Sequence, residues 1–145
     1  RRRVRRRNWL RAVLVDIADG TCSVLEHGYL NRVERPHGLP RAVRQQPARS
    51  STGIRYRDAV YGDRLLVELD GRLYHDSPER RDADFERDLD AAAEGRSTVR
   101  LSYRQVFDRP CRTAAKVAQV LRRNGIPARA RPCGPHCELG ATRAA

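Results

Sequence analysis

The sequence predicts an α/β domain in which a mixed β-sheet of about four strands is flanked by helices. Two patterns indicate this class. Apolar residues recur at helical spacing in four segments, and shorter segments with strand-like alternation lie between them. In chain order the segments run α-α-β-β-β-α-β-α. The length of 145 residues allows one compact domain, and no apolar run approaches the length that crosses a bilayer.

Two helices are expected before the first strand. The first covers residues 9–19 and stops at Gly20, and its apolar face consists of Leu10, Val13, Leu14 and Ile17. Ser23 and Glu26 form a capping-box pattern that opens the second helix. Its apolar stripe is Leu25, Tyr29 and Val33, and the residues that end it are Pro36, Gly38 and Pro40.

Three extended segments follow, at residues 41–49, 53–60 and 65–70. The third is the strongest strand, because apolar residues alternate on one of its faces. The sequence Tyr-Gly-Asp-Arg at 61–64 is typical of a turn. It therefore makes the second and third strands an antiparallel hairpin.

A long helix and a fourth strand come next. Ser77-Pro78 has the N-cap and N1 signature of a helix that reaches about Glu94 and ends at Gly95. The stripe expected to be buried is Phe85, Leu89 and Ala92. Residues 98–103 then form the strand.

The last predicted helix covers residues 110–124. Asp108 is expected to cap its start, and Gly125 is expected to end it. Four residues are expected to face inward: Ala114, Val117, Ala118 and Leu121. The chain from residue 127 onward is interpreted as a tail.

Seven arginines fall within the first eleven residues of a chain whose formal net charge is +12. Such a cluster is typical of a contact with nucleic acid or an anionic surface, because it releases counterions from phosphates. A linker or the solvated start of a helix explains it equally well. The arginines are Arg1, Arg2, Arg3, Arg5, Arg6, Arg7 and Arg11.

The four cysteines do not form a pair of CxxC knuckles; they are Cys22, Cys111, Cys133 and Cys137. Cys133-Gly-Pro-His-Cys137 lies in a Pro/Gly-rich segment, where His136 is a further potential ligand. Zinc would need ligands from elsewhere, and Cys111 is one candidate. Reduced thiols in a loose tail are the favoured interpretation, so structural zinc at Cys133 and Cys137 is not expected.

Acidic residues and a histidine gather around the strongest strand. Asp58 lies on the preceding strand, Glu68 and Asp70 lie two positions apart, and His75 follows. Residues two apart share a face, and an acid on the neighbouring strand joins them across the ladder. Clustered carboxylates repel one another unless a cation lies between them, which favours Mg²⁺. His75 is close enough to serve as a general acid or base.

Each of these residues also has an ordinary interpretation. Asp70-Gly71 is a common turn dipeptide, and Glu68 has many arginines to pair with. Glu26 is explained by helix capping alone, and a lone histidine after a strand is more often structural. Only together do the three acids and the histidine indicate a site.

Two stretches of the chain resemble the very-short-patch-repair-like endonuclease domains of bacteria, which belong to the restriction-endonuclease-like superfamily with its PD-(D/E)XK motif. The first comprises Tyr56-Arg57-Asp58-Ala59-Val60 and Leu66-Val67-Glu68-Leu69-Asp70-Gly71-Arg72-Leu73-Tyr74-His75. The second comprises Phe85-Glu86-Arg87-Asp88-Leu89, Gly95, Val99-Arg100-Leu101 and Gln105-Val106. The resemblance covers roughly residues 22–124 and implies a restriction-endonuclease-like sheet.

The resemblance also implies roles for individual residues. Asp58 matches the first metal-binding aspartate, and Glu68 matches the second acid of the motif. Asp70 stands at the place of the superfamily lysine. His75 matches the histidine that acts as general acid or base in the mismatch-repair nucleases of the family. Glu26 is similar to the acid that many superfamily members contribute to the metal site from an N-terminal helix.

This chain departs from the family pattern at two positions. Arg57 replaces the proline that precedes the first aspartate. The lysine that usually positions the attacking water is missing, and Lys116 lies on a late helix. Arg72 and His75 are the alternatives for that role.

The sequence thus predicts a cytoplasmic, Mg²⁺-dependent DNA endonuclease, with Mn²⁺ as an alternative ion and no membrane partner. The endonuclease domain is expected at residues 21–125, between a basic segment at 1–20, which we expect to continue from a longer protein, and a Cys- and Pro-containing tail at 126–145. The residues expected to contact DNA are Arg2, Arg3, Arg5, Arg6, Arg7 and Arg72. The main alternative is a non-catalytic, antitoxin-like DNA-binding module of the same fold. A zinc-stabilised interaction domain is the third interpretation.

Overall fold

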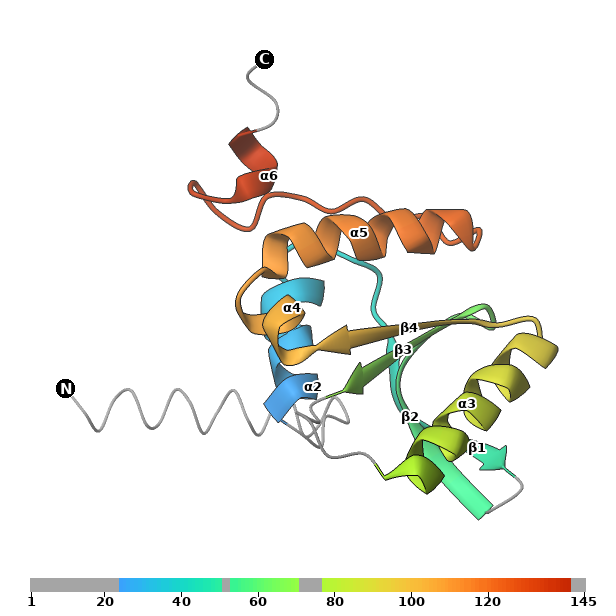
Figure 1. Ribbon diagram of the computed structural model, residues 1–145. Coiled ribbons are helices and arrows are strands. Elements are labelled where there is room, and N and C mark those ends of the chain that lie inside the picture. The colour runs from blue at the N-terminus through green and yellow to red at the C-terminus, as the bar shows by residue number, and fades with distance from the viewer. Residues whose placement is uncertain (1–23, 51–52, 71–76, 142–145) are drawn as a thin grey trace.

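The computed structural model describes residues 24–50, 53–70 and 77–141 (Figure 1). Several predictions lie outside these residues: the helix at 9–19, the cap at Ser23, the N-terminal arginines, Cys22, Arg72 and His75.

Four strands form one mixed sheet in the order β1-β2-β3-β4. β1 (Val43–Ser50), β2 (Gly53–Tyr61) and β3 (Leu65–Asp70) are successively antiparallel, and β4 (Ser97–Ser102) runs parallel to β3. The predicted hairpin is confirmed, because β2 and β3 pair across the turn at 62–64, where Gly62 has a φ of 60°. The expectation of a mixed sheet flanked by helices is therefore confirmed.

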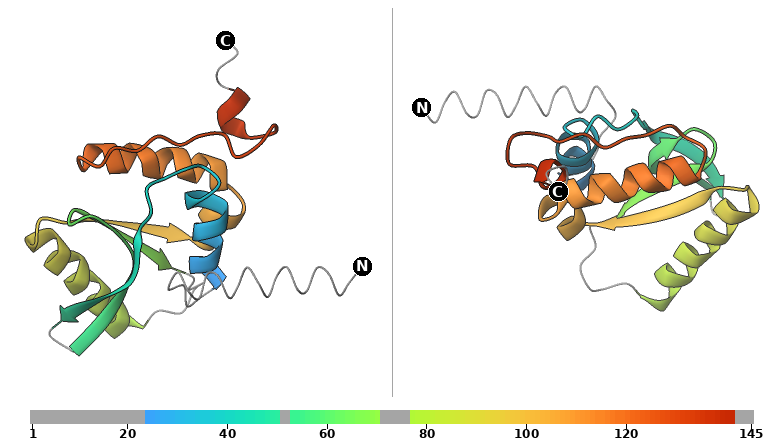
Figure 2. Two further views of the ribbon diagram at one scale, coloured as in Figure 1. Left: turned by 180° about the vertical axis from the view of Figure 1, so that it is seen from behind. Right: turned by 90° about the horizontal axis from the view of Figure 1, so that it is seen from above.

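Helices cover both faces of this sheet (Figures 1 and 2). One face carries α2 (Val24–Gly28), the π-helical segment η1 (Tyr29–Glu34), α4 (Tyr103–Phe107) and α5 (Pro110–Arg123), and the other carries α3 (Pro78–Ala93). α6 (Glu138–Ala141) packs beside α5. No helix in the described part of the chain is long and apolar enough to span a membrane.

Alternation along β3 divides the interior into two layers. Leu65 and Val67 join the main core under α5, whereas Leu66 packs with Val60 and with Ala91 of α3. The inward residues predicted for α5 are all buried in the main core: Ala114, Val117, Ala118 and Leu121. The apolar stripe predicted for the second helix is buried there too: Leu25, Tyr29 and Val33.

A buried polar network ties η1 to β1 and β2. The hydroxyl groups of Tyr29 and Tyr61 lie 2.7 Å apart, and the Tyr61 hydroxyl donates to Glu34 Oε2 at 2.8 Å. The backbone N–H of Ala42 donates to the same oxygen, and the Arg44 guanidinium forms an ion pair with it at 2.9 Å. Burial raises the pKa of both tyrosines, so both stay protonated as hydrogen-bond donors.

Gly28 lets two helices approach closely. A Cβ at this position would collide with the ring of Phe107 at the end of α4. The same ring stacks on Tyr103 with centroids 4.3 Å apart, and the Arg32 guanidinium lies 5.1 Å from its centroid. The absence of a side chain at Gly28 thus allows α4 to pack against the start of η1.

α4 is an element that the sequence prediction lacks, and it changes the assignment of Asp108. Ser102 caps α4 and forms a capping box with Gln105. Asp108 ends α4, and Arg109 is the N-cap of α5 without a side-chain cap bond. The prediction that Asp108 caps the last helix is therefore wrong, because one extra helical turn takes up that residue.

The stripe predicted for α3 is also wrong. Phe85 and Leu89 are 69% and 63% exposed, and Ala92 is exposed too. The helix instead turns Ala91 and Asp84 toward the sheet. On the facing strand β4, Arg100 bonds Asp84 and Asp88, so a charged face of α3 lies toward the sheet.

The segment from residue 126 to residue 137 lies along α5 without forming a helix or strand (Figure 2). Ile126, Ala128 and Ala130 pack against the main core. The backbone N–H of Arg131 donates to the carbonyl of His37 at 2.8 Å. This segment is therefore attached to the loop that follows η1, which places its cysteines beside the rest of the domain.

Candidate functional site

Two predicted acids meet where β2 and β3 separate. The ladder between these strands ends at the pair Ala59↔Val67, so the next residues on each strand are Asp58 and Glu68. Asp58 Oδ2 accepts a hydrogen bond from the backbone N–H of Leu69 at 2.7 Å. The Asp58 side chain thus takes the place of a backbone ladder bond at this position. The same bond fixes the Asp58 carboxylate beside Glu68.

The environment of Glu68 disfavours its charge. Burial raises the pKa of Glu68 above its ordinary value, and the negative charge of Asp58 raises it further. Arg87, Arg100 and Arg57 oppose this shift without cancelling it. The electrostatics therefore indicate that Asp58 and Glu68 lie close enough to repel each other.

Charged residues of β4 and α3 form the wall beside Glu68. Arg100 stands opposite Glu68 in the parallel register, and its guanidinium bonds Asp84 Oδ2 at 3.4 Å and Asp88 Oδ1 at 3.0 Å. Arg87 forms an ion pair with the same Asp84. Two arginines are thus held next to the carboxylates by acids of α3.

Glu26 lies on α2, where its side chain meets β1. It is buried, and Gln45 Nε2 donates to its carboxylate at 2.8 Å. The register of β1 and β2 places Gln45 opposite Asp58, between the pairs Arg44↔Ala59 and Gln46↔Arg57. Gln45 has a φ of 51°, a left-handed conformation that is strained for a residue with a Cβ. This strained residue connects Glu26 with the strand that carries Asp58.

The other predicted site residues are placed as follows. Asp70 is the last residue of β3, half-buried, and stands opposite Ser102 in the register with β4. His75, Arg72 and the N-terminal arginines lie outside the described residues. Lys116, the only lysine of the chain, is exposed on α5, which covers the opposite face of the sheet from the α3 layer that faces Glu68.

A second cluster combines three cysteines with a histidine. The ligand atoms of His37, Cys111, Cys133 and Cys137 all lie within 4.8 Å of one another, an arrangement compatible with zinc. Cys111 Sγ and Cys133 Sγ are 3.7 Å apart, and Cys137 Sγ lies 3.9 Å from His37 Nε2. The expectation of loose thiols in a tail is therefore wrong, because the segment after α5 folds back onto the loop that follows η1.

Sequence reasoning found part of this cluster. It named Cys111 as a candidate third ligand, but it proposed His136, which is exposed and is not a member of the group. His37 was missed, although its position in Pro36-His37-Gly38 indicates a fixed loop. Nothing in the sequence pattern indicates that a residue near position 37 meets a residue near position 137.

Hydrogen bonds orient the members of the cluster. His37 is buried, and its Nδ1 lies 3.0 Å from the carbonyl of Val33, so Nδ1 carries the proton and Nε2 presents its lone pair to Cys137. Burial and the neighbouring thiols raise the pKa of Cys111 to about 12. Burial also disfavours the Cys137 thiolate, but hydrogen bonds with the backbone of Cys133 and Leu139 and with the thiols of Cys111 and Cys133 together lower the pKa of Cys137. The pKa values of Cys111 and Cys137 are thus shifted in opposite directions.

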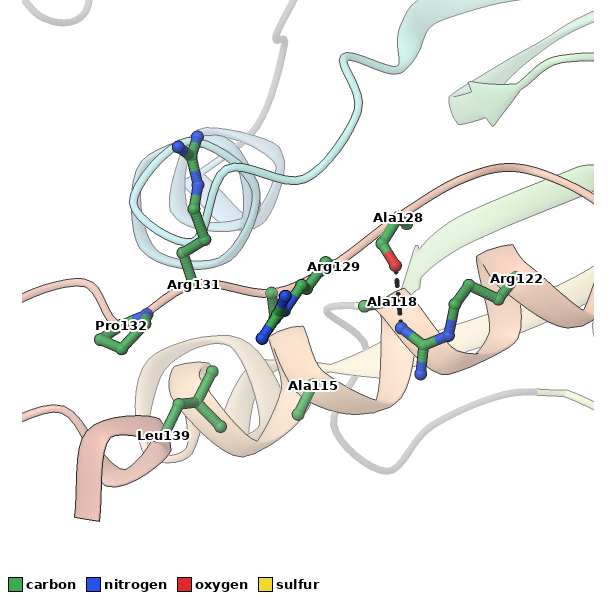
Figure 3. Close-up of a pocket in the computed structure, with 9 residues that line it drawn as sticks. Ala115, Ala118, Arg122, Ala128, Arg129, Arg131, Pro132 and Leu139 are labelled. Carbon is green, nitrogen blue, oxygen red and sulfur yellow. Dashed lines mark hydrogen bonds between the residues drawn. The ribbon is translucent and has the colours of Figure 1, made fainter. Parts of the chain in front are cut away.

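A basic groove lies next to this cluster, between α5 and the segment that returns along it (Figure 3). Three arginines line it: Arg122, Arg129 and Arg131. Arg122 donates to the carbonyl of Ala128 at 2.8 Å, and the Arg131 guanidinium lies against Gly38, where any Cβ would collide with it. The groove thus has walls that are joined to each other by hydrogen bonds and close packing.

Comparison of the chain with protein-family models, with curated proteins and with solved structures gives no match.

Proposed function

We propose that this protein is a metal-dependent endonuclease that hydrolyses phosphodiester bonds in DNA. The observation that carries the proposal is the meeting of Asp58 and Glu68 at the point where β2 and β3 separate, with the Asp58 carboxylate fixed by the Leu69 N–H. A divalent cation bound between these two carboxylates would relieve their mutual repulsion.

The donor set fits Mg²⁺. Asp58 and Glu68 offer carboxylate oxygens, which this ion prefers, and Glu26 of α2 offers a further, buried carboxylate bonded to Gln45. Burial raises the pKa of Glu68 and repulsion by Asp58 raises it further, and a cation between the two side chains would relieve that repulsion. When bound there, a divalent cation polarises the scissile phosphate and lowers the pKa of a water molecule.

The remaining groups of the site have roles that follow from their charge. Arg87 and Arg100 stabilise negative charge on the non-bridging oxygens of the phosphate, and the acids of α3 hold them in place. In the resemblance to the very-short-patch-repair-like endonucleases, His75 supplies or accepts the proton. Asp70 stands in place of the lysine that orients water in the superfamily, so that task falls to His75 or Arg72.

The choice of DNA rests on charge. The chain carries a formal net charge of +12, and 29 of its 30 basic residues are arginines, which form paired hydrogen bonds with phosphates. Arg2, Arg3, Arg5, Arg6 and Arg7 are proposed to contact the phosphate backbone together with Arg72.

A plasmid and short-duplex cleavage assay with Mg²⁺, Mn²⁺ or EDTA tests the proposal. The variants are Asp58→Asn and Glu68→Gln, which keep the size of each side chain, and the matched control is Asp63→Asn in the exposed turn of the same hairpin. We expect metal-dependent cutting that falls at least about 100-fold in both site variants and stays unchanged in the control. Equal cutting by all four proteins would show that the site is elsewhere.

A second candidate function is DNA binding without cleavage, as in an antitoxin-like regulator. The observation that favours it is that the charges of Arg87, Arg100 and Arg57 partly compensate the Glu68 carboxylate without any cation. In that case no metal ion supports cutting, and salt-sensitive DNA binding persists in EDTA. Binding that is unchanged by Glu68→Gln would then support the regulatory interpretation.

A further inference from the structure

Four side chains from three distant parts of the chain bring their ligand atoms within 4.8 Å of one another. His37 follows η1, Cys111 lies in the first turn of α5, and Cys133 and Cys137 belong to the segment beyond α5. A zinc ion with bonds of about 2.3 Å to sulfur places two thiolate ligands about 3.8 Å apart. The observed distance between Cys111 Sγ and Cys133 Sγ is 3.7 Å, and the edge from Cys137 Sγ to His37 Nε2 is 3.9 Å.

We propose that His37, Cys111, Cys133 and Cys137 bind one structural Zn²⁺ ion per chain. Three sulfur ligands and one imidazole are a typical set for structural zinc, and soft thiolates discriminate against Mg²⁺. All four ligand positions are occupied by side chains, so no coordination position is open to water or substrate. The ion therefore stabilises the fold rather than taking part in hydrolysis.

The histidine is prepared for coordination before the ion arrives. Its Nδ1–H donates to the carbonyl of Val33 at 3.0 Å, which fixes the tautomer with a free lone pair on Nε2. The ring is fully buried, so it cannot turn away into solvent. The backbone bond from Arg131 N–H to His37 carbonyl holds the cysteine-bearing segment against the same loop. A second layer of hydrogen bonds of this kind is what metal-binding histidines require.

A disulfide does not explain the cluster. Cys111, Cys133 and Cys137 are all free thiols, and the 3.7 Å between the first two sulfur atoms is well beyond the ~2.05 Å of an S–S bond. A disulfide would also use two of the thiols and leave the third thiol and the buried imidazole unexplained. Zinc uses all four groups.

The ion would hold the segment that lines the basic groove against the rest of the domain. Arg129 and Arg131 lie on the segment between α5 and Cys133, and their backbone has no helix or strand of its own. With Cys133 and Cys137 bound to the same ion as His37 and Cys111, this segment is fixed at its far end. At its near end it is held by α5 and by the bond from Arg122 to Ala128. Metal removal is therefore expected to release the arginine-bearing segment first.

Metal analysis of the full chain, purified without an affinity tag under reducing conditions, tests the proposal. We expect one zinc per chain, and we expect the metal-free protein to bind Co²⁺ with the visible absorption bands of a tetrahedral thiolate complex. Excess Mg²⁺ should not displace the Co²⁺, whereas Zn²⁺ should. This outcome is independent of the carboxylate site, so it neither requires nor supports nuclease activity.

The variant Cys133→Ser removes an exposed ligand, and His136→Gln is the matched control because His136 lies between the two cysteines and outside the cluster. Cys133→Ser should lose at least about tenfold in Zn²⁺ affinity and weaken the Co²⁺ charge-transfer band, while the control keeps both. If Cys133→Ser does not fold, the intensity of that band in the parent still counts the thiolate ligands. A reduced parent protein that holds no zinc and gives no Co²⁺ bands would overturn the proposal. So would a Cys133→Ser variant with the parent's spectrum.

Discussion

The Asp58 carboxylate accepts a hydrogen bond from the Leu69 N–H at 2.7 Å, directly beyond the last paired residues of β2 and β3. Two strands that separate usually leave unpaired backbone groups, and here the side chain satisfies one of them. The same hydrogen bond holds the carboxylate beside Glu68. Asp58 thus stabilises the hairpin and forms part of the candidate site, and the two roles separate in the following substitutions.

Asp58→Ala and Asp58→Asn are expected to abolish metal-dependent cleavage alike but to differ in stability. Asparagine retains a side-chain oxygen that accepts from the Leu69 N–H, whereas alanine leaves this half-buried donor without that partner. We expect a loss of about 1–3 kcal/mol for alanine and less for asparagine. Urea unfolding measures both values. Equal losses of stability in the two variants would contradict the role of the Asp58 side chain as acceptor for the Leu69 N–H.

Glu68→Gln is expected to raise the melting temperature at neutral pH in EDTA. The pKa of Glu68 is raised in the folded state, so the folded protein binds this proton more tightly than the unfolded chain does. Its contribution to stability is complete below the unfolded pKa of about 4.3 and is lost as pH rises through the folded pKa. The gain from glutamine should therefore vanish on acidification below about pH 4. Glu86→Gln on the exposed face of α3 is the control, and a gain that persists in acid would disprove the electrostatic cause.

Substitutions in the buried network are expected to cost more than their exposed counterparts. Tyr61→Phe removes the donor to Glu34, at about 1–3 kcal/mol, and Glu34→Gln leaves Arg44 without its ionic partner, at about 3–5 kcal/mol. Tyr103→Phe changes the same group at a site that is 46% exposed and should stay within about 0.5 kcal/mol. Chemical denaturation compares the three, and a Tyr103 effect as large as that of Tyr61 would contradict the assignment.

Leu89→Ala and Leu121→Ala make a matched pair that tests the orientation of α3. Leu121 is fully buried in the main core, so its truncation should cost about 2–5 kcal/mol. Leu89 is 63% exposed, so its truncation should change the free energy of unfolding by less than about 0.5 kcal/mol. Similar losses of unfolding free energy at both positions would indicate that Leu89 is buried, as the sequence pattern predicts.

Removal of residues 1–7 is expected to weaken DNA binding and to reduce its dependence on salt. Six of these residues are arginines. The slope of log Kobs against log salt concentration should fall by about 0.9 for every phosphate that the shortened protein no longer neutralises. Fluorescence anisotropy over a salt series measures this slope, and an unchanged value would identify the segment as a linker.

Local signals in the sequence predict most of the elements of the described part of the chain. The hairpin follows from the turn at 61–64, and the buried face of α5 follows from its apolar spacing, both confirmed. The proximity of Asp58 and Glu68 follows from the same hairpin. Even the missed helix α4 has a readable signal, since Ser102 and Gln105 form a capping-box pattern.

The predictions are wrong or incomplete where contacts between residues distant in sequence determine the structure. The pattern of Phe85 and Leu89 predicts the buried face of α3, but Arg100 on β4 binds Asp84 and Asp88 and turns a polar face to the sheet. Helical spacing does not report the charge of the facing strand. The participation of His37 in the cysteine cluster is beyond prediction for the same reason, because no local pattern connects it with the far end of the chain.

His37 and Cys137 are 100 positions apart, and all four strands lie between them. A cation bound at the proposed zinc site would convert this stretch into a closed ring. For a covalent closure of that length, the reduced freedom of the unfolded chain amounts to about 4.7 kcal/mol. The proposed closure needs Cys137, so the four ligands are complete only after all four strands have been synthesised.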